Sequence, residues 1–279
     1  MEHIITQAQI EAYCAALWSD ERSAGTVAKY RRDVTAFADW LEGRPASKET
    51  AAGWKAYLLD RGFAPRTINS MLAAINGFFK FMGWSIKVRF LKVQHQLFRD
   101  SGRELTRTEY DRLLAAAQSG GQERLALIME TLCATGIRIS ELRYITVEAA
   151  EAGRATVSLK GKIRTILLST KLCRKLLKYA KKQKIAAGEI FLTSSGKSIS
   201  RRQVWYELKR LCKAAGVEAS KVFPHNFRHL FATIFYRACK DIARLADVLG
   251  HSSIETTRIY LTVSGTEQAR QLDRLGLVS

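Results

Sequence analysis

The chain has 279 residues, of which 47% are hydrophobic and 25% charged, and its formal net charge is +19. This length allows one large domain or two ordinary ones, and the apolar content is enough to bury a core, so wholesale disorder is excluded. So large a positive charge predicts a polyanionic partner.

The remaining compositional features argue against a membrane or secreted protein. No uninterrupted apolar run approaches the roughly 20 residues needed to cross a bilayer, and the N-terminus lacks the pattern of a signal peptide. The five cysteines are scattered and form no Cys-x-x-Cys pair. We therefore expect a reducing, cytoplasmic location, with neither disulfides nor a zinc finger.

The positive charge is concentrated in residues 158–213. This stretch holds 16 basic and two acidic residues, and so carries +14 of the net +19. Neutralising DNA phosphates releases counterions, so we expect binding to DNA that weakens steeply with salt. Four residues of the stretch are predicted to contact DNA, namely Lys162, Arg164, Arg201 and Arg202.

The first 93 residues predict a small helical domain. Apolar residues recur at three- and four-residue steps over 26–41, a second helix is expected over 47–59, and a third follows Pro65. Their aromatic residues are expected in the core. The periodicity then fades, and residues 94–104 are predicted to be a linker.

Residues 105–279 predict a second domain, with a C-terminal tail from about residue 264. Thr106 and Glu109 form a capping box that opens a helix, and a further helix over 123–134 ends at Gly136. A short strand is expected at 144–147, and residues 155–159 and 163–168 predict a hairpin. Helices resume near Lys171. The predicted fold class is therefore mainly α with a small antiparallel β-sheet.

Separated segments of this second domain carry unusual polar groups. Arg138 lies at a junction of two helices, where a helix N-terminus favours an anion. His225 and Arg228, three residues apart, share one helix face. His229 follows His225 by four residues, as in a zinc-binding pair, but Asn226 stands where such a motif needs glutamate. No metal is therefore expected.

The last of these segments contains Leu249-Gly250-His251 and, nine residues after the histidine, Tyr260. Ser252 and Glu255 predict the start of a helix that would place Tyr260 two turns inside it. Chemistry alone leaves other residues open: Tyr206 and Tyr236 are further tyrosines, and Lys162 is a second lysine beside Lys160 in the hairpin turn.

In this order, Arg138, Lys160, His225-x-x-Arg228, Leu249-Gly250-His251 and Tyr260 resemble the signature of the tyrosine recombinase (phage integrase) family, in its short two-domain Xer/Cre-like form. The resemblance covers nearly the whole chain. It implies an N-terminal SAM-like core-binding domain and an α+β catalytic domain. It also implies a site-specific recombinase or integrase that cleaves and rejoins DNA through a 3′-phosphotyrosine intermediate, without cofactor or metal.

The resemblance assigns a catalytic set made of Arg138, Lys160, His225, Arg228, His251 and Tyr260. Tyr260 would be the nucleophile, and the two arginines would clamp the non-bridging phosphate oxygens. His225 would be general base and later acid. Lys160 would protonate the departing 5′-oxygen, His251 would donate a hydrogen bond to the phosphate, and Glu141 would support the site without touching substrate.

The implied partners are double-stranded DNA with a specific site and further copies of the chain, as a homotetramer on DNA, besides accessory DNA-bending or directionality proteins. The amphipathic segment 267–275 would dock on a neighbouring subunit, or else pack on its own. Two alternatives remain: a catalytically silent DNA-binding regulator of the same fold, and an enzyme like the type IB topoisomerases. An RNA-binding function lacks an aromatic-rich motif.

Overall fold

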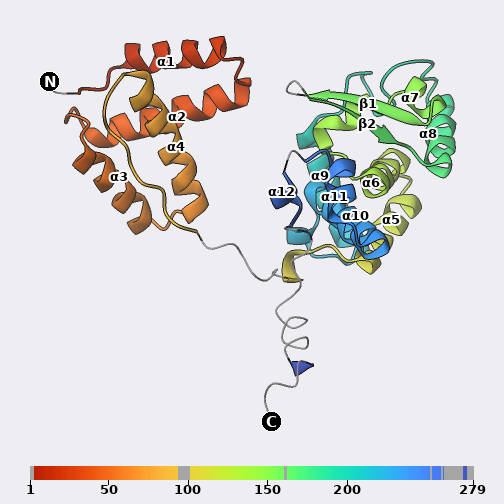
Figure 1. The fold of residues 1–279 in the computed structure, drawn as a ribbon. Helices are drawn as coiled ribbons and strands as arrows, with labels where there is room; N and C mark the ends of the chain where they lie inside the picture. The colour runs from red at the N-terminus through yellow and green to blue at the C-terminus, as the bar shows by residue number, and fades with distance from the viewer. Residues whose placement is uncertain are drawn as a thin grey trace. The chain divides into compact units, whose positions relative to one another are not determined.

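The computed structural model describes residues 3–93, 101–159, 162–251, 253–258, 260 and 273–274. The chain divides into two compact units, residues 1–95 and 96–279 (Figure 1). In the described parts, no helix is both long and apolar enough to cross a membrane.

The first unit is built from four helices, α1 (Gln7–Ser19), α2 (Ala24–Leu41), α3 (Lys48–Asp60) and α4 (Pro65–Phe81). Thr6 and Ser47 close capping boxes at the starts of α1 and α3, and Pro65 occupies the first position of α4. Phe37 of α2 and Phe78 and Phe79 of α4 are completely buried in the core. The prediction of a helical first domain is confirmed.

The second unit begins with η1 (Ser101–Arg103), α5 (Arg107–Ser119), α6 (Glu123–Thr135), η2 (Ile139–Tyr144) and α7 (Val147–Glu151). A hairpin of β1 (Arg154–Leu159) and β2 (Lys162–Leu167) follows, and then α8 (Thr170–Lys182). The chain continues through α9 (Arg201–Ala215), η3 (Ala219–Lys221), α10 (Pro224–Cys239), α11 (Ile242–Leu249) and α12 (Ile254–Arg258).

The hairpin shows how the sheet contributes to the core. Its strands are antiparallel, with Val157 opposite Arg164 and Ala155 opposite Ile166. Ala155, Val157 and Ile166 are buried, whereas Ile163 is 75% exposed, as the alternation of strand side chains requires. The predicted fold class, mainly α with a small antiparallel sheet, is confirmed.

Two local expectations need comment. The strand predicted at 144–147 is wrong: these residues end η2 and begin α7, where the Thr146 hydroxyl accepts the Ala149 N–H at 3.1 Å. A capping threonine here stabilises a helix start rather than a strand. Thr146 forms just an isolated bridge to Glu189. The predicted linker lies mostly outside the described residues, but its end, residues 101–103, forms η1.

Candidate active site

Three chain segments far apart in sequence converge beside the start of α10. Arg138 follows α6, which ends at Gly136 with φ +63°, and His251 follows α11, which ends at Gly250 with φ +64°. A left-handed glycine at each helix end lets the chain turn back at once. His225 and Arg228 lie in the first two turns of α10.

Arg228 is the centre of this group. Its side chain is 1% exposed, and its guanidinium donates to the Gly136 carbonyl, to the Leu249 carbonyl (2.8 Å) and to His251 Nε2 (2.8 Å). Burial, and then repulsion by Arg138, lower the pKa of Arg228 to about 10, and the hydroxyl of Tyr260 opposes this shift. Arg228 therefore stays protonated at neutral pH, and it holds the ends of α6 and α11 together.

His251 is held in one tautomer. A guanidinium has no acceptor, so Nε2 must accept from Arg228, and Nδ1 then carries the proton that it donates to the buried Thr257 hydroxyl (2.9 Å). Burial, followed by the charges of Arg228 and Arg138, lowers the pKa of His251 to about 4. The imidazole is thus neutral at physiological pH.

Arg138 is presented to solvent by a buried acid. The Glu141 side chain is 2% exposed, and it accepts from the Arg138 guanidinium (3.0 Å) and from the Arg138 backbone N–H (2.8 Å). Burial acts to raise the pKa of Glu141, but the Arg138 hydrogen bonds and the charge of Arg164 outweigh it and hold that pKa below its usual value. The Arg138 side chain itself is 43% exposed, so it can reach a ligand.

Tyr260 lies against two histidines. Its ring is 4.7 Å from the His229 ring, edge-on, and 6.0 Å from the His251 ring in a nearly parallel stack. It is 5% exposed and packs with Ala232, Leu245 and Leu249. The helix expected to contain Tyr260 ends earlier, at Arg258, and Tyr260 lies in the turn beyond it. Ser252 lies outside the described residues.

His225 is at the solvent side of the group. Its ring is edge-on to that of His229, at 4.5 Å. Partial desolvation lowers the pKa of His225, although the residue remains exposed, and Arg228, Arg138 and Arg201 lower it further. His229 thus lies between His225 and Tyr260. The spacing of the two histidines in the sequence suggested only a metal-binding pair and did not reveal this position.

Asn226 explains why the histidine spacing does not make a metal motif. Its buried side-chain amide donates to the Arg103 and Lys221 carbonyls, both at 2.7 Å, and so ties η1 and η3 to the start of α10. Among the described residues, no three His, Cys, Asp or Glu side chains are grouped to hold one metal ion. The positive groups of this site are supplied by arginines.

The remaining predicted residues are distributed differently. Lys160 lies outside the described residues, and of Lys162 the structure describes only the backbone of β2. Arg201 and Arg202 are exposed at the start of α9. The Arg164 side chain is 15% exposed and paired with Glu141, so its predicted DNA contact stays a prediction.

The low pKa of His251 makes stability depend on pH. The unfolded histidine titrates near its usual 6.5, while the folded one titrates at about 4. Between these values the unfolded state binds more protons, so the free energy of unfolding falls as pH decreases from 6.5 to 4 and is independent of His251 above 6.5. Denaturant titrations at pH 7 and pH 5 should show a smaller pH difference for His251→Asn than for the wild type. An unchanged difference would refute the assignment.

Two family models match the chain. The model of the phage integrase family matches residues 103–267, and that of the phage integrase N-terminal SAM-like domain matches residues 10–85. The first match alone covers more than half of the sequence. The chain therefore belongs to the phage integrase family, the tyrosine recombinases.

Curated relatives place it near the Xer branch. It is 30% identical to the tyrosine recombinase XerC of Roseiflexus sp. (strain RS-1), over 94% of this chain and 91% of the relative. It is 28% identical to the tyrosine recombinase XerA of Thermococcus kodakarensis, over 95% and 96%. With XerD of Vibrio cholerae the identity is 27%, over 95% of both chains.

Solved structures have the same fold. The XerH site-specific recombinase in a post-cleavage complex with palindromic difH substrate matches with a TM-score of 0.73 and 18% identity, over 98% of this chain and 84% of that one. A lambda integrase tetramer bound to a Holliday junction matches with a TM-score of 0.70 and 20% identity, over 91% and 76%. At such identities the likeness concerns the fold.

Proposed function

We propose that this chain is a site-specific DNA recombinase that cleaves and rejoins strands through a 3′-phosphotyrosine bond to Tyr260. The observation that supports it best is the convergence of Arg138, His225, His251 and Tyr260 around Arg228. Displacement at a phosphodiester increases the charge on the non-bridging oxygens, and preorganised cations stabilise that charge. Membership of the tyrosine recombinases agrees with this chemistry.

Each residue has a role in the proposed reaction. The exposed Arg138 and the buried Arg228 bind the two non-bridging oxygens. Binding of the phosphate to Arg228 competes with its hydrogen bond to His251. For His251 to donate to the phosphate, its proton must move from Nδ1 to Nε2, and the Thr257 hydroxyl then donates to Nδ1 instead of accepting from it. His225, whose lowered pKa favours the neutral ring, takes the proton of Tyr260. This transfer requires Tyr260 to move toward His225, because the His229 ring lies between the two in the structure. Lys160 protonates the leaving 5′-oxygen.

The DNA-binding surface in this proposal includes the exposed side of α9. Arg201 and Arg202 are followed by two exposed aromatic residues, Trp205 (46%) and Tyr206 (58%). The Lys209 ammonium lies 5.3 Å from the centre of the Trp205 ring. Arginine, lysine and tyrosine side chains are all common donors to phosphate oxygens. Lys162 on the hairpin belongs to the same proposed surface.

Neutralising the start of α9 should reduce the salt dependence of DNA binding. We expect the double variant Arg201→Gln, Arg202→Gln to lower the slope of log K against log salt by about 1 for each phosphate that is no longer neutralised. Anisotropy titrations at several salt concentrations measure this slope. The matched control is Lys181→Gln, Lys182→Gln, which removes the same charge from α8, across the unit from α12 (Figure 1). Equal slopes for both double variants would contradict the proposed surface.

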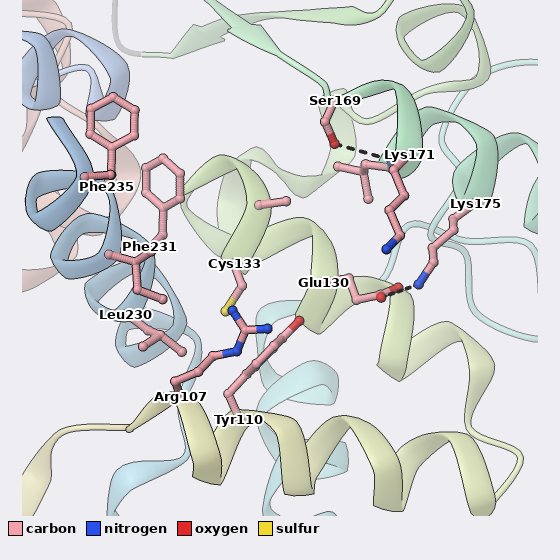
Figure 2. Close-up of a pocket in the computed structure, with 14 residues that line it drawn as sticks. Arg107, Tyr110, Glu130, Cys133, Ser169, Lys171, Lys175, Leu230, Phe231 and Phe235 are labelled. Carbon is pink, nitrogen blue, oxygen red and sulfur yellow. Dashed lines mark hydrogen bonds and ion pairs between the residues drawn. The ribbon is translucent and has the colours of Figure 1, made fainter.

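The proposal extends to assembly as a homotetramer on DNA, with contacts made by the C-terminal segment. That segment, residues 267–275, lies almost wholly outside the described residues. A cavity of about 470 Å³ between α5, α6, α8 and α10 is a candidate acceptor (Figure 2). Leu230, Phe231 and Phe235 line one side, and Lys171 and Lys175 the other. Deleting residues 264–279 should leave binding of one site intact and reduce synapsis of two.

The decisive experiment is capture of the covalent intermediate. The protein is incubated with fragments of its own genome in EDTA, denatured in SDS, and the protein-linked DNA is recovered and sequenced. Digestion and mass spectrometry then locate the modified peptide, expected to contain Tyr260. An adduct on Tyr206 or Tyr236 would contradict the role of Tyr260, and binding without any adduct would favour the silent regulator.

A second assay separates recombination from relaxation. Plasmids carrying one or two copies of the recovered sequence distinguish them, because recombination joins two sites, while a topoisomerase-like enzyme relaxes a plasmid with one. We also propose a cytoplasmic location, a linker between the two domains over residues 94–104, and accessory DNA-bending or directionality proteins as partners.

A further inference from the structure

Arg164, unlike Arg201 and Arg202, is partly buried and ion-paired within the protein. It lies on β2 opposite Val157, two positions before the buried Ile166. Side chains two apart on a strand point to the same face, so Arg164 is directed toward the core and not toward solvent. Its stem starts in the hairpin formed by β1 and β2.

The guanidinium of Arg164 joins two parts of the active site. Nη2 donates to Glu141 Oε2, while Glu141 Oε1 accepts from Arg138. Nη1 donates to the Val248 carbonyl in the last turn of α11 (2.9 Å). One side chain thus contacts the acid that orients Arg138 and the helix end that leads to His251.

Gly250 shows how closely Arg164 fits. A Cβ atom built on Gly250 would lie 2.5 Å from Arg164 Cδ, 2.8 Å from Nη1 and 2.9 Å from Nε. Any larger residue at position 250 would displace the guanidinium. The residue that follows Gly250 is His251, so Arg164 packs directly on the turn that orients this histidine.

The hydrogen bonds of Arg164 are incomplete. Its Nε is buried and finds no acceptor among the described residues. A buried donor without an acceptor lowers the stability of the folded state, so this arrangement is not the one that stability alone would favour. The buried arginine is explained better by a requirement for geometry than by its contribution to folding.

We infer that Arg164 is a positioning residue for strand cleavage. It orients Arg138 through Glu141, and it orients His251 by packing on the turn at Gly250, so that both groups face the same phosphate. Arg164 itself does not touch DNA. Because the guanidinium bridges both groups, docking of the hairpin on the core sets both sides of the phosphate-binding site at once. This inference rests on the proposed function.

The test compares Arg164→Gln with Arg154→Gln, an exposed arginine of the same hairpin. The substrate is a nicked duplex carrying the sequence recovered from covalent adducts. We expect Arg164→Gln to lower the single-turnover cleavage rate about 100-fold, as small misplacements in active sites do, while the Kd for DNA changes less than about threefold. Arg154→Gln should cleave at the wild-type rate. If the affinity for DNA fell by the same factor as the rate, Arg164 would be a DNA contact. If the cleavage rate were unchanged, Arg164 would position nothing. Either result overturns the inference.

A second substrate distinguishes which group Arg164 positions. With sulfur in place of the bridging 5′-oxygen, the departing thiolate needs no proton, so the role assigned to Lys160 is bypassed. We expect the defect of Arg164→Gln to persist on this substrate, because the contacts of Arg164 are on the phosphate side. Recovery of the wild-type rate would mean that Arg164 acts through the lysine, against the inference.

If Arg164→Gln does not fold, as melting curves will show, Arg164→Lys replaces it. Lysine keeps the charge beside Glu141 but lacks the planar fork that contacts two separate acceptors. The same loss of rate with unchanged Kd is expected, and a wild-type rate would overturn the inference. Failure of the proposed function would look different, since the wild type would then form no covalent adduct.

Discussion

The replacement Tyr260→Phe is expected to abolish covalent protein–DNA complexes and strand cleavage while leaving DNA binding within about threefold of the wild type. The change removes the one oxygen that would form the phosphotyrosine bond. The phenyl ring keeps the contacts of Tyr260 with the His229 and His251 rings, and the burial against Leu245 and Leu249. The measurements are SDS-resistant adduct yield and the Kd from anisotropy.

Two tyrosines provide matched controls for this prediction. Tyr236 is partly buried against the same small cluster as Tyr260, and Tyr206 is exposed on α9. Tyr236→Phe and Tyr206→Phe should both form adducts at wild-type yield. Adducts that persist in Tyr260→Phe, or vanish in either control, would move the nucleophile to another residue.

The replacement Arg228→Lys should have the second largest effect, lowering the cleavage rate by about 100- to 1,000-fold, the usual cost of losing one preorganised donor to a developing oxyanion. An ammonium keeps the charge but cannot bind a phosphate oxygen while holding the Gly136 and Leu249 carbonyls as the guanidinium does. A buried carbonyl left without a donor costs about 1–3 kcal/mol, so the melting temperature should fall too.

Arg237→Lys is the control, since Arg237 is exposed on the same helix, α10. It should retain both cleavage rate and melting temperature. If Arg228→Lys cleaved at the wild-type rate, Arg228 would be a structural residue that merely holds two helix ends together. Loss of stability without loss of rate, measured well below the melting temperature, would lead to the same conclusion.

Local sequence patterns predicted most of the fold because they act through neighbouring residues. The Thr106–Glu109 capping box and the hairpin alternation both appear in the structure. The strand expected at 144–147 was wrong because contacts between neighbouring residues stabilise helical turns there instead. Tyr144 and Val147 favour a strand locally, but the buried Glu141 accepts the Arg138 N–H, and that contact stabilises the 3-10 helix that ends at Tyr144.

The sequence by itself determined which chemistry is available: two arginines, a lysine, two histidines and a tyrosine in the order of the tyrosine recombinases, with no acid placed to complete a metal site. Only the tertiary structure decided how these groups act on one another. The tautomer of His251 depends on Arg228, 23 residues away, and Arg164 reaches Val248, 84 residues along the chain. His229 is placed between His225 and Tyr260 by the packing of α10 against the turn after α12. Such contacts arise where separate elements meet in the core, and residue spacing along one helix or strand holds no information about them.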